Sequence, residues 1–135
     1  MSTPEKIVRA AGISPQKYSY IKDLCMCVDN VEIDLDGLKL LPDEEIIAIL
    51  DDIKGIGRWT AEMFLIFSLY RADVFALDDL GLRNAIAKAY KLKKLPDRKK
   101  MLEISKKWEP YRSVAVLYLW RNNDTVTKAG VKKTN

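Results

Sequence analysis

No segment of this 135-residue chain alternates apolar and polar residues over the length of a β-strand, whereas helix start signals recur along it. Thr3-Pro4 and Ser14-Pro15 each place a capping residue before a proline suited to a first helical turn. Asp97 is a further capping candidate. The sequence therefore predicts an all-α fold, a compact multi-helix domain.

The helical spacing and the capping residues give approximate bounds for the expected helices. They cover residues 4–11, 15–28, a short turn at 35–40, 43–52, 58–69, 79–90 with Asp78 or Asp79 as the cap, 97–108 and 111–121. The apolar residues of 58–69 are expected to be mostly core, and 111–121 is apolar almost all round, as for a helix central to the core. We expect one domain over residues 1–121 and a polar tail over 122–135.

The composition excludes several classes of protein. With 48% hydrophobic and 31% charged residues, the chain resembles ordinary globular proteins rather than disordered ones. It has no apolar run of membrane-spanning length and no apolar secretion signal, so we expect an intracellular protein. Cys25 and Cys27 are the only cysteines, too few for a disulfide framework or an iron–sulfur cluster, and we interpret both as buried, reduced thiols.

Positive charge is concentrated in one part of the chain. The net charge is +4, and between residues 86 and 107 only Asp97 and Glu103 oppose a long series of cations. The cations are Lys88, Lys91, Lys93, Lys94, Arg98, Lys99, Lys100, Lys106 and Lys107. Two interpretations stay open, a solvated surface without a partner and a face that binds a polyanion.

Between two expected helices lies the segment Ile53-Lys54-Gly55-Ile56-Gly57. Its glycines permit a tight turn, and the helix that follows presents backbone N–H groups and a positive dipole end at its start. A phosphate group fits such a position. By itself this pattern is more often a packing device than a nucleic-acid site.

Three blocks in order carry a more specific signal. They are Ile53 to Ala61 (IKGIGRWTA), Asp73 to Arg83 (DVFALDDLGLR), and Trp108 to Ser113 (WEPYRS) with Tyr118-Leu119-Trp120. Together they resemble the helix-hairpin-helix superfamily of DNA glycosylases, and most closely its 3-methyladenine DNA glycosylase II branch. A weaker match at residues 10–14 and Lys17 extends the resemblance toward the start of the chain.

The resemblance implies that Asp79 is the catalytic carboxylate and that Asp78 is a supporting neighbour. Cleavage of an N-glycosidic bond builds positive charge on the deoxyribose, which a carboxylate stabilises while it orients water. The residues alone favour a simpler role for Asp79, as the cap of its helix, and the two roles are compatible.

The resemblance also implies how the damaged base is held. Trp59 occupies the position where some superfamily members carry a nucleophilic lysine, so a monofunctional enzyme that uses water is expected. Trp59 and Trp120 match aromatic residues around a flipped, cationic base, and Met63 and Leu80 match two further positions of that pocket. The alternative is that the two tryptophans are core residues.

Double-stranded DNA with a flipped damaged base is the implied partner. The N–H groups of Gly55, Gly57 and Thr60 are expected to hold its phosphate, with Lys54 and Arg58 beside them. The family's monovalent cation, Na⁺ or K⁺, would be ligated by three backbone carbonyls, those of Asp51, Ile53 and Gly55. No cofactor is expected to be required.

The superfamily carries upstream helices, and a residue that wedges into the duplex, before the region matched here. Three functions therefore stay open: a glycosylase, a non-catalytic helix-hairpin-helix DNA-binding module, and one half of a split enzyme. A second copy of the chain or a partner chain is expected over the surface that the upstream helices would cover. The expected location is the cytoplasm at the nucleoid, or the nucleus in a eukaryote.

Overall fold

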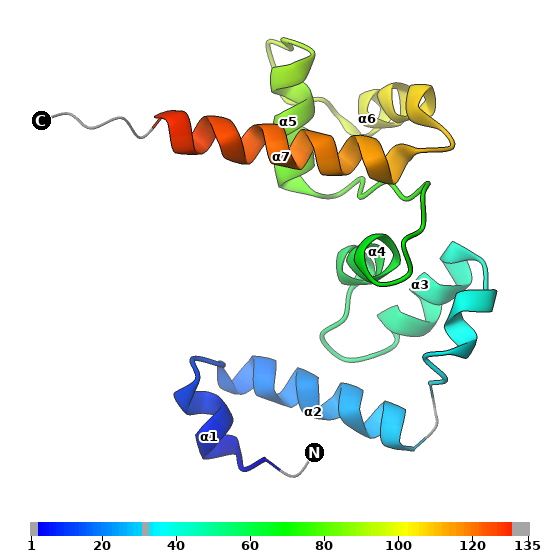
Figure 1. Ribbon diagram of the computed structural model, residues 1–135, viewed down its shortest axis with the longest axis vertical. Coiled ribbons are helices and arrows are strands. Elements are labelled where there is room, and N and C mark those ends of the chain that lie inside the picture. Colours follow the sequence, from blue (N-terminus) through cyan, green and yellow to red (C-terminus); the bar gives the residue numbers. More distant parts are fainter. Residues whose placement is uncertain (1–2, 31–32, 131–135) are drawn as a thin grey trace, which may run out of the picture. The chain divides into compact units, whose positions relative to one another are not determined.

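The computed structural model describes residues 3–30 and 33–130, with side chains described as far as residue 122, and divides into two compact units (Figure 1). The first unit comprises residues 1–61 and the second residues 62–135. Every regular element in the described ranges is helical, in agreement with the predicted all-α class. None of the helices in these ranges combines the length and the apolar character needed to cross a bilayer.

The first unit contains α1 (Glu5–Ala10), α2 (Pro15–Asp29), the 3₁₀ helix η1 (Gly37–Leu40) and α3 (Asp43–Asp51). Ser14 caps α2 as predicted, its side chain accepting a hydrogen bond from the backbone N–H of Lys17 at 3.3 Å. The apolar face of α3 is buried. Its buried residues are Ile46, Ile47 and Leu50.

The prediction of buried cysteines is wrong, because Cys25 and Cys27 are both half-buried. They lie on α2, a helix without a single fully buried residue. Both are free thiols. A helix that buries little on any face leaves even its small apolar side chains in partial contact with water.

α4 (Arg58–Phe67) begins in the first unit and continues into the second. Leu65 and Ile66 are buried, whereas Met63 and Phe64 are half-buried and Phe67 is 51% exposed. The expectation that this apolar stretch is mostly core is therefore only partly met. A helix that packs on one side buries a stripe of residues rather than every apolar position.

The second unit contains α5 (Leu80–Ala89), α6 (Arg98–Ser105), the 3₁₀ helix η2 (Lys106–Trp108) and α7 (Arg112–Gly130). Asp97 caps α6 as predicted, accepting from the backbone N–H of Lys100 at 2.8 Å. α7 packs against α5, and Figure 1 shows the two helices crossing. The buried residues of α5 are Leu82, Ala85 and Ile86, and those of α7, as far as residue 122, are Ser113 and Val116.

Two predictions about α7 are wrong. The helix does not end near residue 121 but continues to Gly130, because neither proline nor glycine interrupts it earlier. It is also not buried all round, since Val114, Leu117 and Tyr118 are exposed. The last five residues of the predicted tail, 131–135, lie outside the described residues.

Candidate active site

Asp79 is the N-cap of α5, with extended backbone angles (φ −72°, ψ 117°). Its Oδ1 accepts a hydrogen bond from the backbone N–H of Leu82. The capping role that the residues alone suggested is therefore confirmed. The half-buried carboxylate sits at the N-terminus of a helix, where the helix dipole stabilises its negative charge.

The same oxygen of Asp79 also accepts a hydrogen bond from Nε1 of Trp120, at 2.9 Å. The indole of Trp120 is in turn stacked against Phe67, with ring centroids 6.2 Å apart and an angle of 15° between the planes. Trp120 comes from α7 and Phe67 from the end of α4. Residues far apart in the sequence thus fix the position of the carboxylate.

Gly81 provides the space that this arrangement needs. A Cβ atom at this position would lie 3.2 Å from Oδ1 of Asp79 and 3.8 Å from Nε1 of Trp120. The first of these contacts is tighter than ordinary van der Waals packing and would displace the carboxylate by a few tenths of an ångström. A glycine directly after the Asp79-Leu80 pair therefore allows the indole and the carboxylate to meet.

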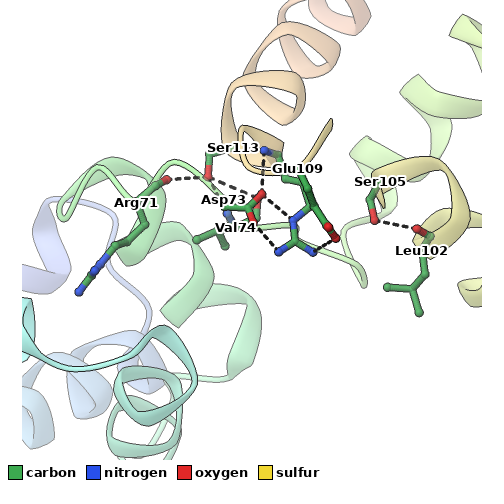
Figure 2. Close-up of polar contacts among 8 residues, drawn as sticks. Arg71, Asp73, Val74, Leu102, Ser105, Glu109 and Ser113 are labelled. Carbon is green, nitrogen blue, oxygen red and sulfur yellow. Dashed lines mark hydrogen bonds and ion pairs between the residues drawn. The ribbon is translucent and has the colours of Figure 1, made fainter. Parts of the chain in front are cut away.

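The loop that carries Asp79 is fastened to the start of α7 (Figure 2). Arg112 donates from Nε and Nη2 to the two carboxylate oxygens of Asp73, at 2.7 and 2.8 Å, and its backbone N–H donates to the same group. The hydroxyl of Ser113 donates to the carbonyl of Arg71 at 2.6 Å and accepts from the backbone N–H of Val74 at 2.9 Å. The hydrogen bonds of Arg112 hold the pKa of Asp73 below its ordinary value.

Asp78 does not share the surroundings of Asp79. It is exposed and forms an ion pair with Arg98. Both residues line a cavity of about 420 Å³. The other lining residues are Leu77, Leu80, Arg83, Asp97 and Met101. The structure therefore places Leu80, a predicted pocket residue, on this cavity, whereas Asp79 and Trp120 do not line it.

The hairpin of the first unit has the tight turn that its glycines predicted. Gly55 has a φ of +88°, and a Cβ atom on it would lie 2.1 Å from the ring of Tyr20. Both observations require glycine at this position. Gly57 has only Asp51 within 4 Å of such a Cβ atom, at 3.9 Å, so its surroundings are open. α4 begins directly afterwards, at Arg58.

The two cations predicted to lie beside DNA are paired with acidic residues. Arg58 forms two hydrogen bonds with the carboxylate of Glu44, at 2.6 and 3.0 Å, which hold the pKa of Glu44 below its ordinary value. The ammonium group of Lys54 lies 3.9 Å from a carboxylate oxygen of Asp23. Carboxylates of the first unit thus balance the positive charge of the hairpin.

The predicted site residues are divided between the two units. The hairpin residues and Trp59, which is 49% exposed, belong to the first unit, and Met63, Asp79, Leu80 and Trp120 belong to the second. Among the predicted residues of the second unit, the structure joins Asp79 and Trp120 directly, by the hydrogen bond from Nε1 of Trp120. The carbonyls assigned to a cation lie at the end of α3 and in the hairpin, and that of Ile53 accepts from the N–H of Ile56 at 3.0 Å.

Sequence reasoning missed two parts of this arrangement. It interpreted Phe67 as core, whereas the ring is half-exposed and stacks on Trp120. It also assigned no role to Asp73 in holding the loop. The Arg112-Ser113 pair was visible as part of a motif, but its partners lie 39 to 42 positions earlier in the chain and no local pattern identifies them.

No family model matches the chain. It is 39% identical over 119 residues to DNA-3-methyladenine glycosylase 1 of Schizosaccharomyces pombe, covering 87% of this chain and 52% of that protein. The crystal structure of a DNA-3-methyladenine glycosidase from Bacillus halodurans matches with a TM-score of 0.78 and 38% identity, over 94% of this chain and 58% of that one.

A structure of the Schizosaccharomyces pombe 3-methyladenine DNA glycosylase in complex with abasic DNA matches with a TM-score of 0.77 and 37% identity, over 90% of this chain and 60% of that one. The chain belongs to the helix-hairpin-helix superfamily of DNA glycosylases. Within it, the relatives are DNA-3-methyladenine glycosylases, as the motifs predicted. The chain spans about half the length of the curated relatives it matches.

Proposed function

We propose that the chain acts in base excision repair as a monofunctional DNA glycosylase that hydrolyses the N-glycosidic bond of alkylated purines such as 3-methyladenine. The observation that carries this proposal is the carboxylate of Asp79, fixed at the N-terminus of α5 by Leu82 and Trp120. Relatives that share this region are named DNA-3-methyladenine glycosylases. The proposed place of action is wherever the chromosome lies, the nucleoid or the nucleus.

The chemistry assigned to Asp79 is electrostatic. As the bond from the sugar to the base breaks, positive charge develops on the deoxyribose, and a preorganised carboxylate stabilises it. The carboxylate also orients the water that attacks the sugar carbon. An alkylated purine that already carries positive charge leaves without prior protonation, which suits a chain that contains no histidine.

The nucleophile proposed is water rather than a side chain. Trp59 stands where some superfamily members have a lysine, and an indole cannot form a Schiff base with the sugar. The chain is therefore expected to release the base without cutting the strand. The half-exposed rings of Trp59 and Trp120 are assigned to the cationic base, and Met63 and Leu80 to the same pocket.

The hairpin is assigned to the DNA backbone. The N–H groups at the start of an α-helix have no partner within the helix, and those of Gly55, Gly57 and Thr60 are proposed to bind one phosphate. Arg58 and Lys54 lie next to this position, in the ion pairs described above. Three backbone carbonyls, of Asp51, Ile53 and Gly55, would supply oxygen ligands of the kind that Na⁺ or K⁺ accepts, since the last carbonyls of an α-helix have no partner within the helix.

A second function is favoured by one observation. Oδ1 of Asp79 caps α5 and binds Trp120, so the carboxylate also has a purely structural use. A non-catalytic DNA-binding module, or one half of a split glycosylase, would keep Asp79 for that reason alone. In the second case another copy of the chain or a partner chain would complete the enzyme.

The experiment compares the chain with its Asp79→Asn variant on alkylated duplex DNA, measuring release of 3-methyladenine and 7-methylguanine. Asparagine is also a good N-cap, so the variant keeps the contacts of Oδ1 and removes only the charge. Asp97→Asn is the matched control, because Asp97 also caps a helix of the second unit. Release lost only in Asp79→Asn supports the enzyme. No release by the unmodified chain, with DNA binding intact, supports the module or the split enzyme.

A further inference from the structure

A second cationic region belongs to the second unit, on the connection between α5 and α6. Its members are exposed lysines of the second unit, named here the basic surface: Lys88, Lys91, Lys93, Lys94 and Lys99. Within the described residues, none of their ammonium groups takes part in an ion pair. No described carboxylate therefore pairs with these charges, whereas those of Lys54 and Arg58 are paired.

The connection between α5 and α6, which carries most of the basic surface, is anchored to the rest of the second unit. The N–H of Leu92 donates to the carbonyl of Ala87 at 2.8 Å and closes the end of α5. Arg83 donates from Nε to the carbonyl of Pro96 at 2.6 Å, and Pro96 is buried. These contacts hold the lysines close to the end of α5 and the start of α6, so their positive charges are concentrated.

The start of α6 adds positive charge where a helix disfavours it. Arg98, Lys99 and Lys100 occupy its first three positions, next to the positive end of the helix dipole. Part of this charge is offset by the cap of Asp97 and by the ion pairs of Arg98 with Asp78 and of Lys100 with Glu103. Stability of the helix therefore does not explain the cluster, whereas an external polyanion does.

We propose that the basic surface binds the phosphate backbone of duplex DNA and supplies most of the salt-dependent affinity of the chain for it. The inference rests on the proposed function only in taking DNA as the polyanion. The hairpin then contributes mainly backbone N–H groups, since carboxylates balance its cations. Lysine is a compact charge without directional base readout, so binding through this surface is independent of sequence.

The test uses undamaged duplex DNA and measures the affinity of the whole chain over a range of salt concentrations. The variant Lys91→Gln/Lys93→Gln/Lys94→Gln removes three of the charges. The affinity decreases with salt, and each lost phosphate contact makes the slope of log affinity against log salt less steep by about 0.9. The magnitude of the slope is therefore expected to decrease by about 2 to 3. The variant Lys91→Arg/Lys93→Arg/Lys94→Arg keeps the charges and is expected to keep the slope.

The matched control is Lys6→Gln/Lys17→Gln/Lys22→Gln, which removes the same net charge from exposed lysines of the first unit. Its slope should stay close to that of the unmodified chain. The proposal would be overturned by equal slopes for the unmodified chain and the Lys91→Gln/Lys93→Gln/Lys94→Gln variant. Equal losses of slope in the two glutamine variants would overturn it as well. So would failure of the unmodified chain to bind duplex DNA at about 50 mM salt.

This measurement is separate from base release. A chain that binds DNA through the basic surface without excising a base would contradict the proposed catalysis and leave the present inference standing. Excision by the unmodified chain, with an unchanged salt slope in the Lys91→Gln/Lys93→Gln/Lys94→Gln variant, would support the proposed catalysis and contradict the present inference. Thermal unfolding of each variant, followed by circular dichroism, checks that the exposed substitutions have left the helices intact.

Discussion

Nε1 of Trp120 donates a hydrogen bond of 2.9 Å to Oδ1 of Asp79, the atom that also caps α5. One oxygen therefore joins α7 to the start of α5 at the proposed catalytic residue. Because the stacked ring of Phe67 restricts the indole as well, the carboxylate is held in place before any substrate binds. Preorganisation of this kind is what electrostatic stabilisation of a developing cation requires.

Replacing Trp120 with phenylalanine removes the donor and keeps an aromatic ring against Phe67. A hydrogen bond to a charged group contributes about 1.5 to 3 kcal/mol, so we expect base release to slow by about tenfold or more. Single-turnover excision kinetics measure this. Trp108→Phe is the control, since Trp108 packs edge-on against Phe75 with centroids 6.0 Å apart. Equal rates for Trp120→Phe and the unmodified chain would refute the role of the donor.

Gly81→Ala should separate activity from stability. The added Cβ atom would lie 3.2 Å from Oδ1 of Asp79 and push the carboxylate away from its position. Alanine is meanwhile the better helix former, by about 0.5 to 1 kcal/mol. We expect a midpoint of thermal unfolding that is unchanged or higher, with base release reduced about tenfold, as for about 1.4 kcal/mol of transition-state stabilisation. Unchanged excision would mean that the carboxylate tolerates the displacement.

The two glycines of the hairpin should respond differently to alanine. Gly55→Ala combines a left-handed backbone with a clash against Tyr20, so we expect a loss of about 2 to 4 kcal/mol in the free energy of unfolding. Gly57→Ala meets open surroundings and should change stability by less than about 0.5 kcal/mol. Alanine keeps the backbone N–H that is assigned to a phosphate, but its added methyl group would crowd that phosphate, so we expect the duplex affinity to fall about tenfold. Chemical denaturation and DNA binding measure the two effects.

The ion pair of Asp73 with Arg112 predicts a pH-dependent stability. The folded pKa of Asp73 lies below its unfolded value, so its contribution is present above about pH 3.9 and is lost as the pH falls through the folded pKa. Asp73→Asn should cost about 1 to 2 kcal/mol at pH 7, since the pair is partly exposed, and progressively less in acid.

The control for this prediction is Asp36→Asn. The pKa of Asp36 is lowered by the hydrogen bond from Lys39, but the pair is fully exposed and water screens it. Denaturation of both variants at pH 7 and in acid makes the comparison. A deficit in Asp73→Asn that is the same at both pH values would show that the substitution acts through packing rather than charge.

The sequence by itself determined the elements and most of their starts, although Thr3 does not cap α1, whose N-cap is Pro4 without a side-chain cap hydrogen bond. Ser14, Asp79 and Asp97 each cap a helix by accepting from an N–H three residues later, so the pattern that reveals the cap is also the interaction. Gly55 was likewise recognisable, because a left-handed turn between helices is a local requirement. The motif blocks, read together, gave the superfamily that the comparisons bear out.

Only the tertiary structure decided which residues meet. Composition made α7 look buried all round, but a helix that packs on one side buries one face and exposes Tyr118. The contacts of Trp120 with Asp79 and Phe67, and of Arg112 with Asp73, join positions about forty or more apart. Such contacts depend on how whole helices pack, which no short stretch of sequence encodes. Local rules therefore located the carboxylate and its cap, and packing determined that Trp120 also holds it.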